Sequence, residues 1–391
     1  MTNWRVILAV GVLLGATAAC SSDGGSAVGT TAAAAESTAP APDTAAPDTA
    51  APDTTAVPDT TAVPDTTTSP AAEWEAITAP ADCMCFDGAK FTYWTRTANP
   101  AKVMFFMEGG GACFDAQTCA PDSTAFKRVV GDGPTTRTDG IFDFTNPANP
   151  FADWSIVYVP YCTGDIFLGD AQHDYGNGVV IEHRGSVDAK AALQHMAEAF
   201  PDATQVLVTG ESAGAAPDGL YAGLAADLLP KASITILADG AGAYPDVPAI
   251  NGLIGGLWGT QNAVPDWPEV KGMTAEQWSL PGLFVKATEH APRIVSARHD
   301  YAFDETQTFF GGLAGFNSDN LIELIDQNEQ QIEAGGVDLL SYISPGSTHT
   351  VLGRPEFYTE TLNGILLVDW VTALVTGGTV ADNHCTGDCK A

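Results

Sequence analysis

The chain has 391 residues, of which 48 are acidic and 16 are basic, so its formal net charge at pH 7 is −32. Residues 73–391 hold 41 of the acidic and 15 of the basic residues, which leaves this part alone near −26. This excess of carboxylates argues against a nucleic-acid partner, because contacts with phosphates need Lys and Arg.

The first 20 residues have the pattern of an export signal. Arg5 precedes an apolar stretch, 6–19, that is too short to span a membrane. The stretch ends in "TAAC", which resembles a bacterial lipobox in which Cys20 would be lipidated and become the mature N-terminus. Ordinary signal-peptide cleavage near Ala19 is the alternative. We therefore predict an exported protein, either anchored to a membrane only through lipid on Cys20 or secreted.

Residues 21–72 are of low complexity. They repeat a Pro-Asp-Thr unit and contain neither Lys nor Arg. Such a segment has too few apolar residues to bury a core and is expected to stay extended and solvated. We predict a disordered spacer that holds a folded domain away from the membrane.

The remaining residues, 73–391, alternate between the two main patterns of secondary structure. Apolar runs predict strands at 102–110, 155–160, 205–209, 233–240, 292–300 and 339–344, and helical spacing predicts helices at 186–200, 213–229, 318–336 and 362–375. Strands that alternate with helices predict one α/β domain with a mostly parallel sheet flanked by helices. Residues 241–290 break this rhythm with three Trp among Pro and Gly, and we expect a cap or lid there.

The stretch "VLVTGESAGA", 207–216, contains Ser212 in a G-x-S-x-G pattern after an apolar run. A serine nucleophile of an α/β-hydrolase lies on a sharp turn between a buried strand and a helix, which matches this context. Pro217 requires that the following helix begin late or be distorted. The alternative is a plain strand–turn–helix without chemistry.

A serine nucleophile needs a histidine base and an acid that orients it, in the chain order Ser, Asp or Glu, His. His349 follows the last predicted strand, where this base is expected, whereas His183 precedes Ser212 and His299 leaves little room for an acid. The acid should lie in "ARHDYAFDETQ", and the residues alone leave Asp300 and Asp304 equal. Either Asp could instead be a turn former or a helix cap.

Backbone amides must also stabilise the oxyanion that forms on the substrate. One is expected from Ala213, directly after the serine, and a second from the loop "FMEGGGACF", which contains Gly110 and Gly111. A turn that needs positive φ is the alternative explanation of these glycines. A phosphate-binding loop is excluded, because no G-K-[ST] follows.

Seven cysteines follow Cys20, and none of them forms a C-x-x-C pair. An H-E-x-x-H motif is also absent, so we expect neither a metal nor another cofactor. In an exported protein these cysteines predict disulfides, with Cys113–Cys119 and Cys385–Cys389 as plausible local pairs. Since seven is odd, one thiol must be left over.

The motifs together resemble the pectin acetylesterase family. The resemblance is carried in order by "CFDGAKFTYW", "MEGGGACFD", "YVPYCTGD", "HRG", "GESAGA", "LADGAG" and "FDETQ". It implies an α/β-hydrolase-type serine esterase without a metal, with the following site: Ser212 as nucleophile, His349 as base, Asp304 as acid, and Gly110, Gly111 and Ala213 at the oxyanion positions. Ala112, Glu211 and Pro217 depart from the family pattern, and 241–291 has no firm match.

These observations predict an exported, monomeric serine carboxylesterase. Through an acyl-enzyme it would remove acetyl or other short acyl groups from small-molecule or carbohydrate esters. One alternative is a lipase-like or short-chain esterase that acts on apolar acyl esters. Another is a surface lipoprotein that binds carbohydrate on a hydrolase scaffold without catalysis. The cap at 241–290 would discriminate between the substrates.

Overall fold

The computed structural model describes residues 72–317 and 320–390. The predicted signal segment, Cys20 and the spacer up to residue 71 lie outside the described residues. Within the described residues, no helix combines the length and the apolar composition needed to cross a bilayer.

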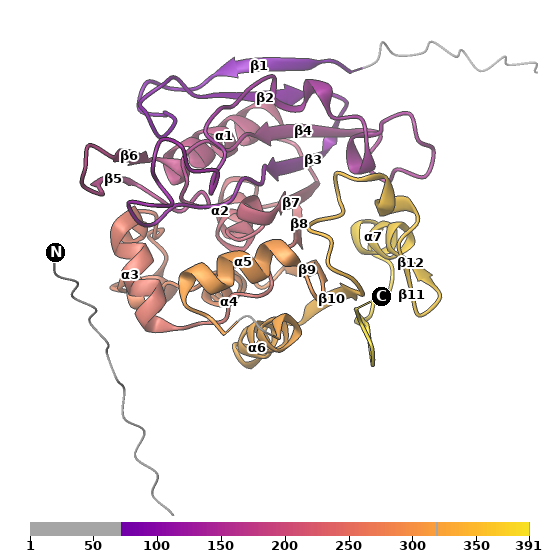
Figure 1. Ribbon diagram of the computed structural model, residues 1–391. Coiled ribbons are helices and arrows are strands. Elements are labelled where there is room, and N and C mark those ends of the chain that lie inside the picture. The colour runs from indigo at the N-terminus through magenta and orange to yellow at the C-terminus, as the bar shows by residue number, and fades with distance from the viewer. Residues whose placement is uncertain (1–71, 318–319, 391) are drawn as a thin grey trace, which may run out of the picture. The chain divides into compact units, whose positions relative to one another are not determined.

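The described chain is built around a nine-stranded sheet (Figure 1). In spatial order its strands are β1 (Trp74–Thr78), β2 (Thr92–Arg96), β4 (Trp154–Val159), β3 (Asn99–Met107), β7 (Gln205–Glu211), β8 (Ser233–Asp239), β9 (Ile294–Tyr301), β10 (Leu339–Ser344) and β13 (Asn383–His384). The strands from β4 to β13 are parallel, and β1 and β2 add an antiparallel edge. The predicted, mostly parallel sheet is therefore confirmed.

Helices cover both faces of this sheet. They are α1 (Gly185–Ala199), α2 (Asp218–Leu228), α3 (Pro248–Trp258), α4 (Leu280–His290), α5 (Glu305–Ala314), α6 (Leu321–Ala334) and α7 (Leu367–Thr376). Side chains of β3 alternate between two cores, as the period of a strand requires. Phe105 packs in a core with α1, α2 and α4, whereas Met104 and Phe106 pack in a second core with α7.

Short 3₁₀ helices lie in the connections. They are η1 (Gly133–Thr136), η2 (Gly140–Phe142), η3 (Ser212–Gly214), η4 (Thr260–Asn262), η5 (Pro268–Val270), η6 (Ala275–Gln277) and η7 (Pro355–Tyr358). One of them, η3, lies at the turn that carries Ser212, and η4, η5 and η6 lie in the stretch 241–290, where a cap or lid was expected. In that stretch α3 packs against η6, whereas α4 packs against α2 and belongs to the main core.

The segment 362–375 differs from the single closing helix that its apolar character predicts. It begins with a hairpin of β11 (Thr361–Leu362) and β12 (Ile365–Leu366), and α7 starts only at Leu367. The turn is Asn363-Gly364, with φ of 52° and 81°. Asn-Gly is the pair that two-residue hairpin turns favour, because both positions need positive φ. A second hairpin, β5 (Ala171–Asp174) with β6 (Val180–His183), and the edge strands β1 and β2 were not predicted.

Three disulfides join six of the seven cysteines that follow Cys20. Cys113–Cys119 and Cys385–Cys389 are the two local pairs expected from the sequence, and Cys85–Cys162 is the third. The remaining thiol among the described residues is the buried Cys83. Disulfides of this number indicate an oxidising compartment.

Candidate active site

Ser212 lies at a sharp turn where β7 ends. Its φ is +55°, a left-handed conformation that non-glycine residues adopt at a cost of about 1–3 kcal/mol and that is frequent at functional sites. The turn needs its two glycines: a Cβ on Gly210 would lie 2.4 Å from the carbonyl carbon of Gly214, and one on Gly214 would lie 2.1 Å from the backbone oxygen of Met107. The regular helix α2 starts only at Asp218, as Pro217 requires.

Asp304 and His349 come from different connections and form a hydrogen-bonded pair. His349 Nδ1 donates to Asp304 Oδ2 over 2.6 Å, and the carboxylate is fully buried. Asp304 caps α5, where its Oδ1 accepts from the backbone amides of Thr306 and Gln307 at 2.8 and 3.0 Å. These bonds fix the direction in which the carboxylate meets the imidazole.

The other ring nitrogen of His349 has no hydrogen-bond partner within the described residues. His349 and Ser212 line the same polar cleft, together with Glu108, Arg137 and Thr306. A hydrogen bond from Ser212 Oγ to His349 Nε2 is not formed among the described contacts. Such bonds are often long without substrate and tighten in the complex. The arrangement thus places the Ser212 hydroxyl and the imidazole of His349 at one cleft, with a buried unpaired Nε2 on the ring and a buried carboxylate behind it.

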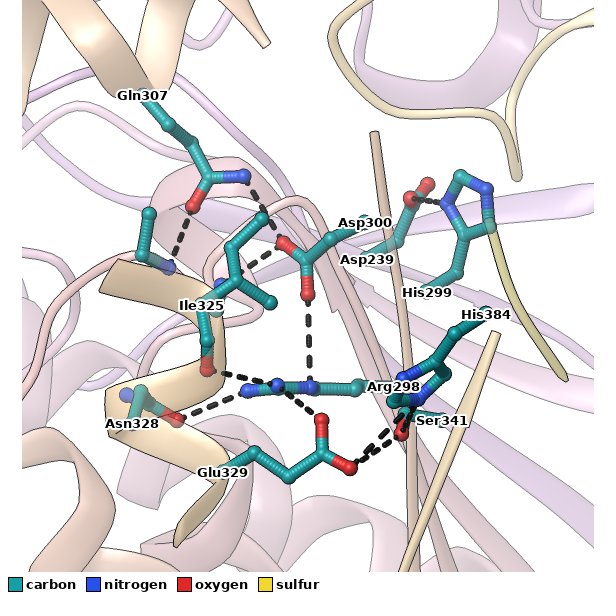
Figure 2. A network of polar contacts seen from close by, with 12 residues as sticks. Asp239, Arg298, His299, Asp300, Gln307, Ile325, Asn328, Glu329, Ser341 and His384 are labelled. Carbon is teal, nitrogen blue, oxygen red and sulfur yellow. Dashed lines mark hydrogen bonds and ion pairs between the residues drawn. The ribbon is translucent and has the colours of Figure 1, made fainter. Parts of the chain in front are cut away.

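Asp300, the alternative acid, does not contact His349 in the described structure. Its Oδ1 accepts from the amide of Gly242 at 2.8 Å and from Gln307 Nε2 at 2.9 Å, and its Oδ2 faces the guanidinium of Arg298 (Figure 2). Burial raises the pKa of Asp300, which the charge on Arg298 partly offsets. Asp300 thus links the loop after β8 to α5 by hydrogen bonds.

The alternative histidines are both buried and have both ring nitrogens occupied. His299 Nδ1 donates to Asp239 at 2.9 Å (Figure 2). Its Nε2 accepts from Ser344 at 3.1 Å. His183 donates to the carbonyl of Thr163 and accepts from Tyr175. Burial lowers the pKa of His183 to about 4, so this ring is neutral at pH 7.

The glycine-rich loop after β3 lies against the serine. A Cβ on Gly109 would be 3.1 Å from Ser212 Cβ, so only glycine permits this approach. Gly111 has φ of +72° and, like Ser212, lines two neighbouring cavities. Among the described contacts, no hydrogen bond uses the amide of Gly110 or Gly111 as donor. The amide of Ala213 lies in the first turn of η3, where helical amides have no partner within the helix.

An apolar cavity of about 140 Å³ also adjoins Ser212. Its walls come from α3, the connection to α4, the end of α5, and the loops after β3 and β4. They include Phe114, Ile166, Ile254, Trp258, Trp278 and Phe310. Trp258 is fixed by its indole, which donates to the backbone oxygen of Cys113 at 2.8 Å. The expected cap segment therefore supplies walls of this cavity.

Two contacts of the site were not predicted from the sequence. Gln307 Nε2 donates both to Asp300 Oδ1 and, at 3.1 Å, to Asp304 Oδ2, the oxygen that also accepts from His349. The spacing D-E-T-Q is that of a helix-capping box, a signal that could have drawn attention to Gln307. Arg137 binds both oxygens of Glu211 at 2.8 and 2.9 Å and so holds the residue before the serine. No sequence signal connects these two positions.

The fold is of the α/β-hydrolase type. A crystal structure of the Wnt deacylase Notum from Drosophila superimposes with a TM-score of 0.58 at 16% identity, over 80% of this chain and 96% of that one. At this identity the likeness concerns the fold alone.

Sequence comparisons point to one family. The family described as Pectinacetylesterase matches residues 70–254, which confirms the resemblance that the motifs indicated. Pectin acetylesterase 5 of Arabidopsis thaliana is 28% identical over 181 residues, 43% of this chain and 41% of that one. Palmitoleoyl-protein carboxylesterase notum2 of Xenopus laevis is 28% identical over 137 residues, 33% of this chain and 27% of that one. The matched part thus spans less than half the length of these relatives.

Proposed function

We propose that this protein is an exported serine carboxylesterase. The observation that carries the proposal is the Asp304–His349 hydrogen bond, with Nε2 left free at the cleft that Ser212 lines. A buried acid on Nδ1 and an Nε2 without another hydrogen-bond partner are what a general base for a serine needs. The names of the similar proteins, a pectin acetylesterase and a palmitoleoyl-protein carboxylesterase, support the same class of reaction.

The residues have the following roles in this proposal. Ser212 Oγ attacks the ester carbonyl while His349 Nε2 takes its proton, and Asp304 holds the imidazole in orientation. The amides of Gly110, Gly111 and Ala213 donate to the oxyanion. His349 then gives the proton to the departing alcohol oxygen, and a water molecule cleaves the acyl-enzyme by the same route.

The two cavities at Ser212 suggest which part of the ester lies where. The acyl chain occupies the apolar cavity, and the alcohol lies in the polar cleft beside Glu108 and Arg137. A cavity of 150 Å³ holds about one benzene molecule, so about 140 Å³ accommodates roughly six carbons. We therefore propose an ester of a polar alcohol, such as a sugar, with a short acyl chain longer than acetyl. This combines the apolar acyl group of the lipase-like alternative with a carbohydrate alcohol.

A series of esters with acyl chains from two to twelve carbons tests the reaction and the cavity together. Wild type should show its highest kcat/KM near six carbons, and Ser212→Ala should lose hydrolysis of every ester by several orders of magnitude. Ile254→Trp, which fills the cavity, should shift the optimum to shorter chains. Leu253→Trp is the matched control, because Leu253 lies on the same helix but is 68% exposed. An optimum at acetyl, unchanged by Ile254→Trp, would contradict the acyl assignment alone.

A fluorophosphonate probe decides between catalysis and the non-catalytic alternative. The probe should label wild type and not Ser212→Ala, since it reacts only with an activated serine. An inactive relative exists: a protein named inactive palmitoleoyl-protein carboxylesterase notum1b, from Danio rerio, is 28% identical over 109 residues. Unlabelled, inactive wild type would therefore favour a binding protein.

Export and anchoring belong to the same proposal. The three disulfides fit an oxidising compartment. Lipid on Cys20 would anchor the chain through the 21–72 spacer, because acyl chains and not polar residues provide membrane affinity. Wild type should then fractionate with membranes, and Cys20→Ser should release the protein or block its processing. Wild type found wholly in the medium with an unmodified N-terminus would refute the anchor.

A further inference from the structure

A cluster of metal-ligating side chains lies at the edge of the sheet where β10 pairs with β13. Glu329 comes from α6, Asp382 directly precedes β13, and His384 belongs to β13. Each residue offers one ligand atom, and these atoms lie within 4.8 Å of one another. Figure 2 shows Glu329 and His384 converging on Ser341. The members are far apart in the sequence, which is why no metal motif indicated them.

Each carboxylate has one oxygen held by a hydrogen bond from the fold. Arg298 donates to Glu329 Oε2 at 2.7 Å, and Glu329 Oε1 lies 3.6 Å from His384 Nε2. Asp382 Oδ1 accepts from the amide of Ser341 at 2.9 Å, which leaves its second oxygen for another partner. Carboxylates that bind metals are commonly oriented in this way by a hydrogen bond from outside the site.

The histidine is presented by an anchored strand. His384 pairs with Ile343 of β10, and its neighbour Asn383 donates from its side chain to the backbone oxygen of Leu362 at 3.0 Å. The disulfide Cys385–Cys389 follows at once. Only Asp382 is exposed, so a small movement of this carboxylate is enough to complete the site.

We propose that Glu329, Asp382 and His384 bind one Zn²⁺ ion. Ligands of a tetrahedral zinc ion at about 2.0–2.2 Å lie about 3.3–3.6 Å apart, close to the 3.6 Å between Glu329 Oε1 and His384 Nε2. An imidazole among carboxylates favours zinc over calcium and magnesium, which prefer oxygen ligands only. The hydroxyl of Ser341 or a water molecule takes the fourth position. The ion links α6 to the C-terminal strand and is independent of the esterase proposal.

Zinc binding requires two local changes. The Ser341 hydroxyl now bridges Glu329 Oε1 and His384 Nε2 at 2.9 and 2.7 Å, and it must turn to let the ion in. The imidazole must bind through an unprotonated Nε2, with its proton on Nδ1.

Calorimetric titration of the chelator-treated full chain with zinc chloride at pH 7.5 tests the site. Wild type should bind one Zn²⁺ per chain with a micromolar or lower Kd, and calcium chloride should not compete. His384→Ala should weaken binding at least about 100-fold and Asp382→Asn at least about tenfold. Zinc at about 100 times its Kd should also raise the Tm of wild type by several degrees, and this rise should be absent in His384→Ala.

His290 provides a matched control, because it too lies beside one Asp and one Glu. Asp227 and Glu269 contact it as well, but on opposite ring nitrogens, at 2.7 Å from Nε2 and 3.3 Å from Nδ1, so they cannot share one ion with the ring. His290→Ala should keep the full zinc stoichiometry. Equal loss in His290→Ala and His384→Ala, no stoichiometric binding by wild type, or displacement by calcium would each overturn the proposal. Unchanged circular dichroism establishes that each variant is folded.

Discussion

Two Asp–His pairs, His299 with Asp239 and His349 with Asp304, lie near the ends of neighbouring strands and have the same hydrogen bond at Nδ1. In both, imidazole Nδ1 donates to a buried carboxylate: His299 to Asp239 at 2.9 Å and His349 to Asp304 at 2.6 Å. They differ at the other nitrogen. His299 is fully buried and its Nε2 accepts from Ser344, whereas the side chain of His349 is 21% exposed and its Nε2 has no partner among the described residues. A His–Asp pair thus offers a base only where the second nitrogen has no hydrogen-bond partner, and for this reason His349–Asp304 is called the open pair below.

The buried pair nevertheless helps to hold the loop that carries His349. Asp239 Oδ2 accepts at 2.7 and 2.8 Å from the amides of Val351 and Leu352, which lie two and three residues after His349 in the chain. The loop that carries His349 is therefore tied to β8 through Asp239. This predicts different results for the two pairs: changes at the open pair reduce catalysis, and changes at the buried pair reduce stability first.

The largest expected effect is at the two histidines. His349→Gln should reduce kcat/KM by about 10⁴–10⁶-fold without loss of stability, because the serine then lacks its base. His299→Gln should keep activity within about tenfold and lower the Tm, because Gln can replace only part of the buried contacts. Kinetics and thermal unfolding of both variants measure this. A strong loss of activity in a stable His299→Gln, with His349→Gln active, would reverse the assignment.

The two candidate acids should separate in the same way. Asp304→Asn should lower kcat by about 10³–10⁴-fold, because the amide no longer favours the required tautomer and the imidazolium. Asp300→Asn leaves buried Arg298 with Glu329 as its charged partner and weakens the hydrogen bonds of position 300, so it should cost stability, about 1–3 kcal/mol, with a smaller effect on kcat. Both variants need kcat at saturating substrate and denaturant unfolding. If Asp300→Asn proves the more damaging to kcat, Asp304 is not the acid.

The sequence predicted the fold well where patterns are local. The runs at 155–160 and 339–344 became β4 and β10, because uninterrupted apolar residues suit a sheet buried on both faces. The prediction of one helix over 362–375 was wrong in its first part, because it followed the apolar residues and overlooked the Asn363-Gly364 turn. The edge strand β1 was not predicted because a half-exposed strand has a weak pattern, and β2 was not predicted because Thr and Arg interrupt its buried aromatic residues.

The candidate site was predictable as a set of residues but not as a set of contacts. The G-x-S-x-G pattern and the chain order indicated Ser212 and His349, whereas the residues alone left the acid open between two positions four apart. Only the three-dimensional arrangement shows that Gln307 bridges the two carboxylates and that His349 meets Asp304. Hydrogen bonds between distant segments, such as Arg137 with Glu211, leave no periodic trace in a sequence.

A third histidine sharpens the contrast, because His183 is buried without a carboxylate. Its pKa is lowered from 6.5 to about 4, mainly by burial, so the folded state favours the neutral ring. The stability that this provides is complete above pH 6.5 and is lost as the pH falls toward 4, up to about 3 kcal/mol. His183→Gln should remove this part of the acid sensitivity. Denaturant unfolding of both proteins between pH 7.5 and 4.5 measures it, and parallel pH curves would contradict the expectation.

The smallest expected effect concerns the charge around the open pair. The sealed His299 pair cannot meet a substrate, whereas the open cleft at His349 lies on a domain with a net charge near −26. Repulsion should slow the encounter with a polyanion such as acetylated polygalacturonate, relative to neutral acyl esters of sugars or aryl alcohols. At 0.01 M salt the Debye length is about 30 Å, and at 0.5 M it is only a few ångströms. The ratio of kcat/KM for neutral and polyanionic esters should therefore fall several-fold between these salt concentrations. A preference for the polyanion at low salt that weakens with added salt would instead reveal local attraction at the cleft. Lys127 and Arg137 are basic residues at this place, but both are already paired with carboxylates.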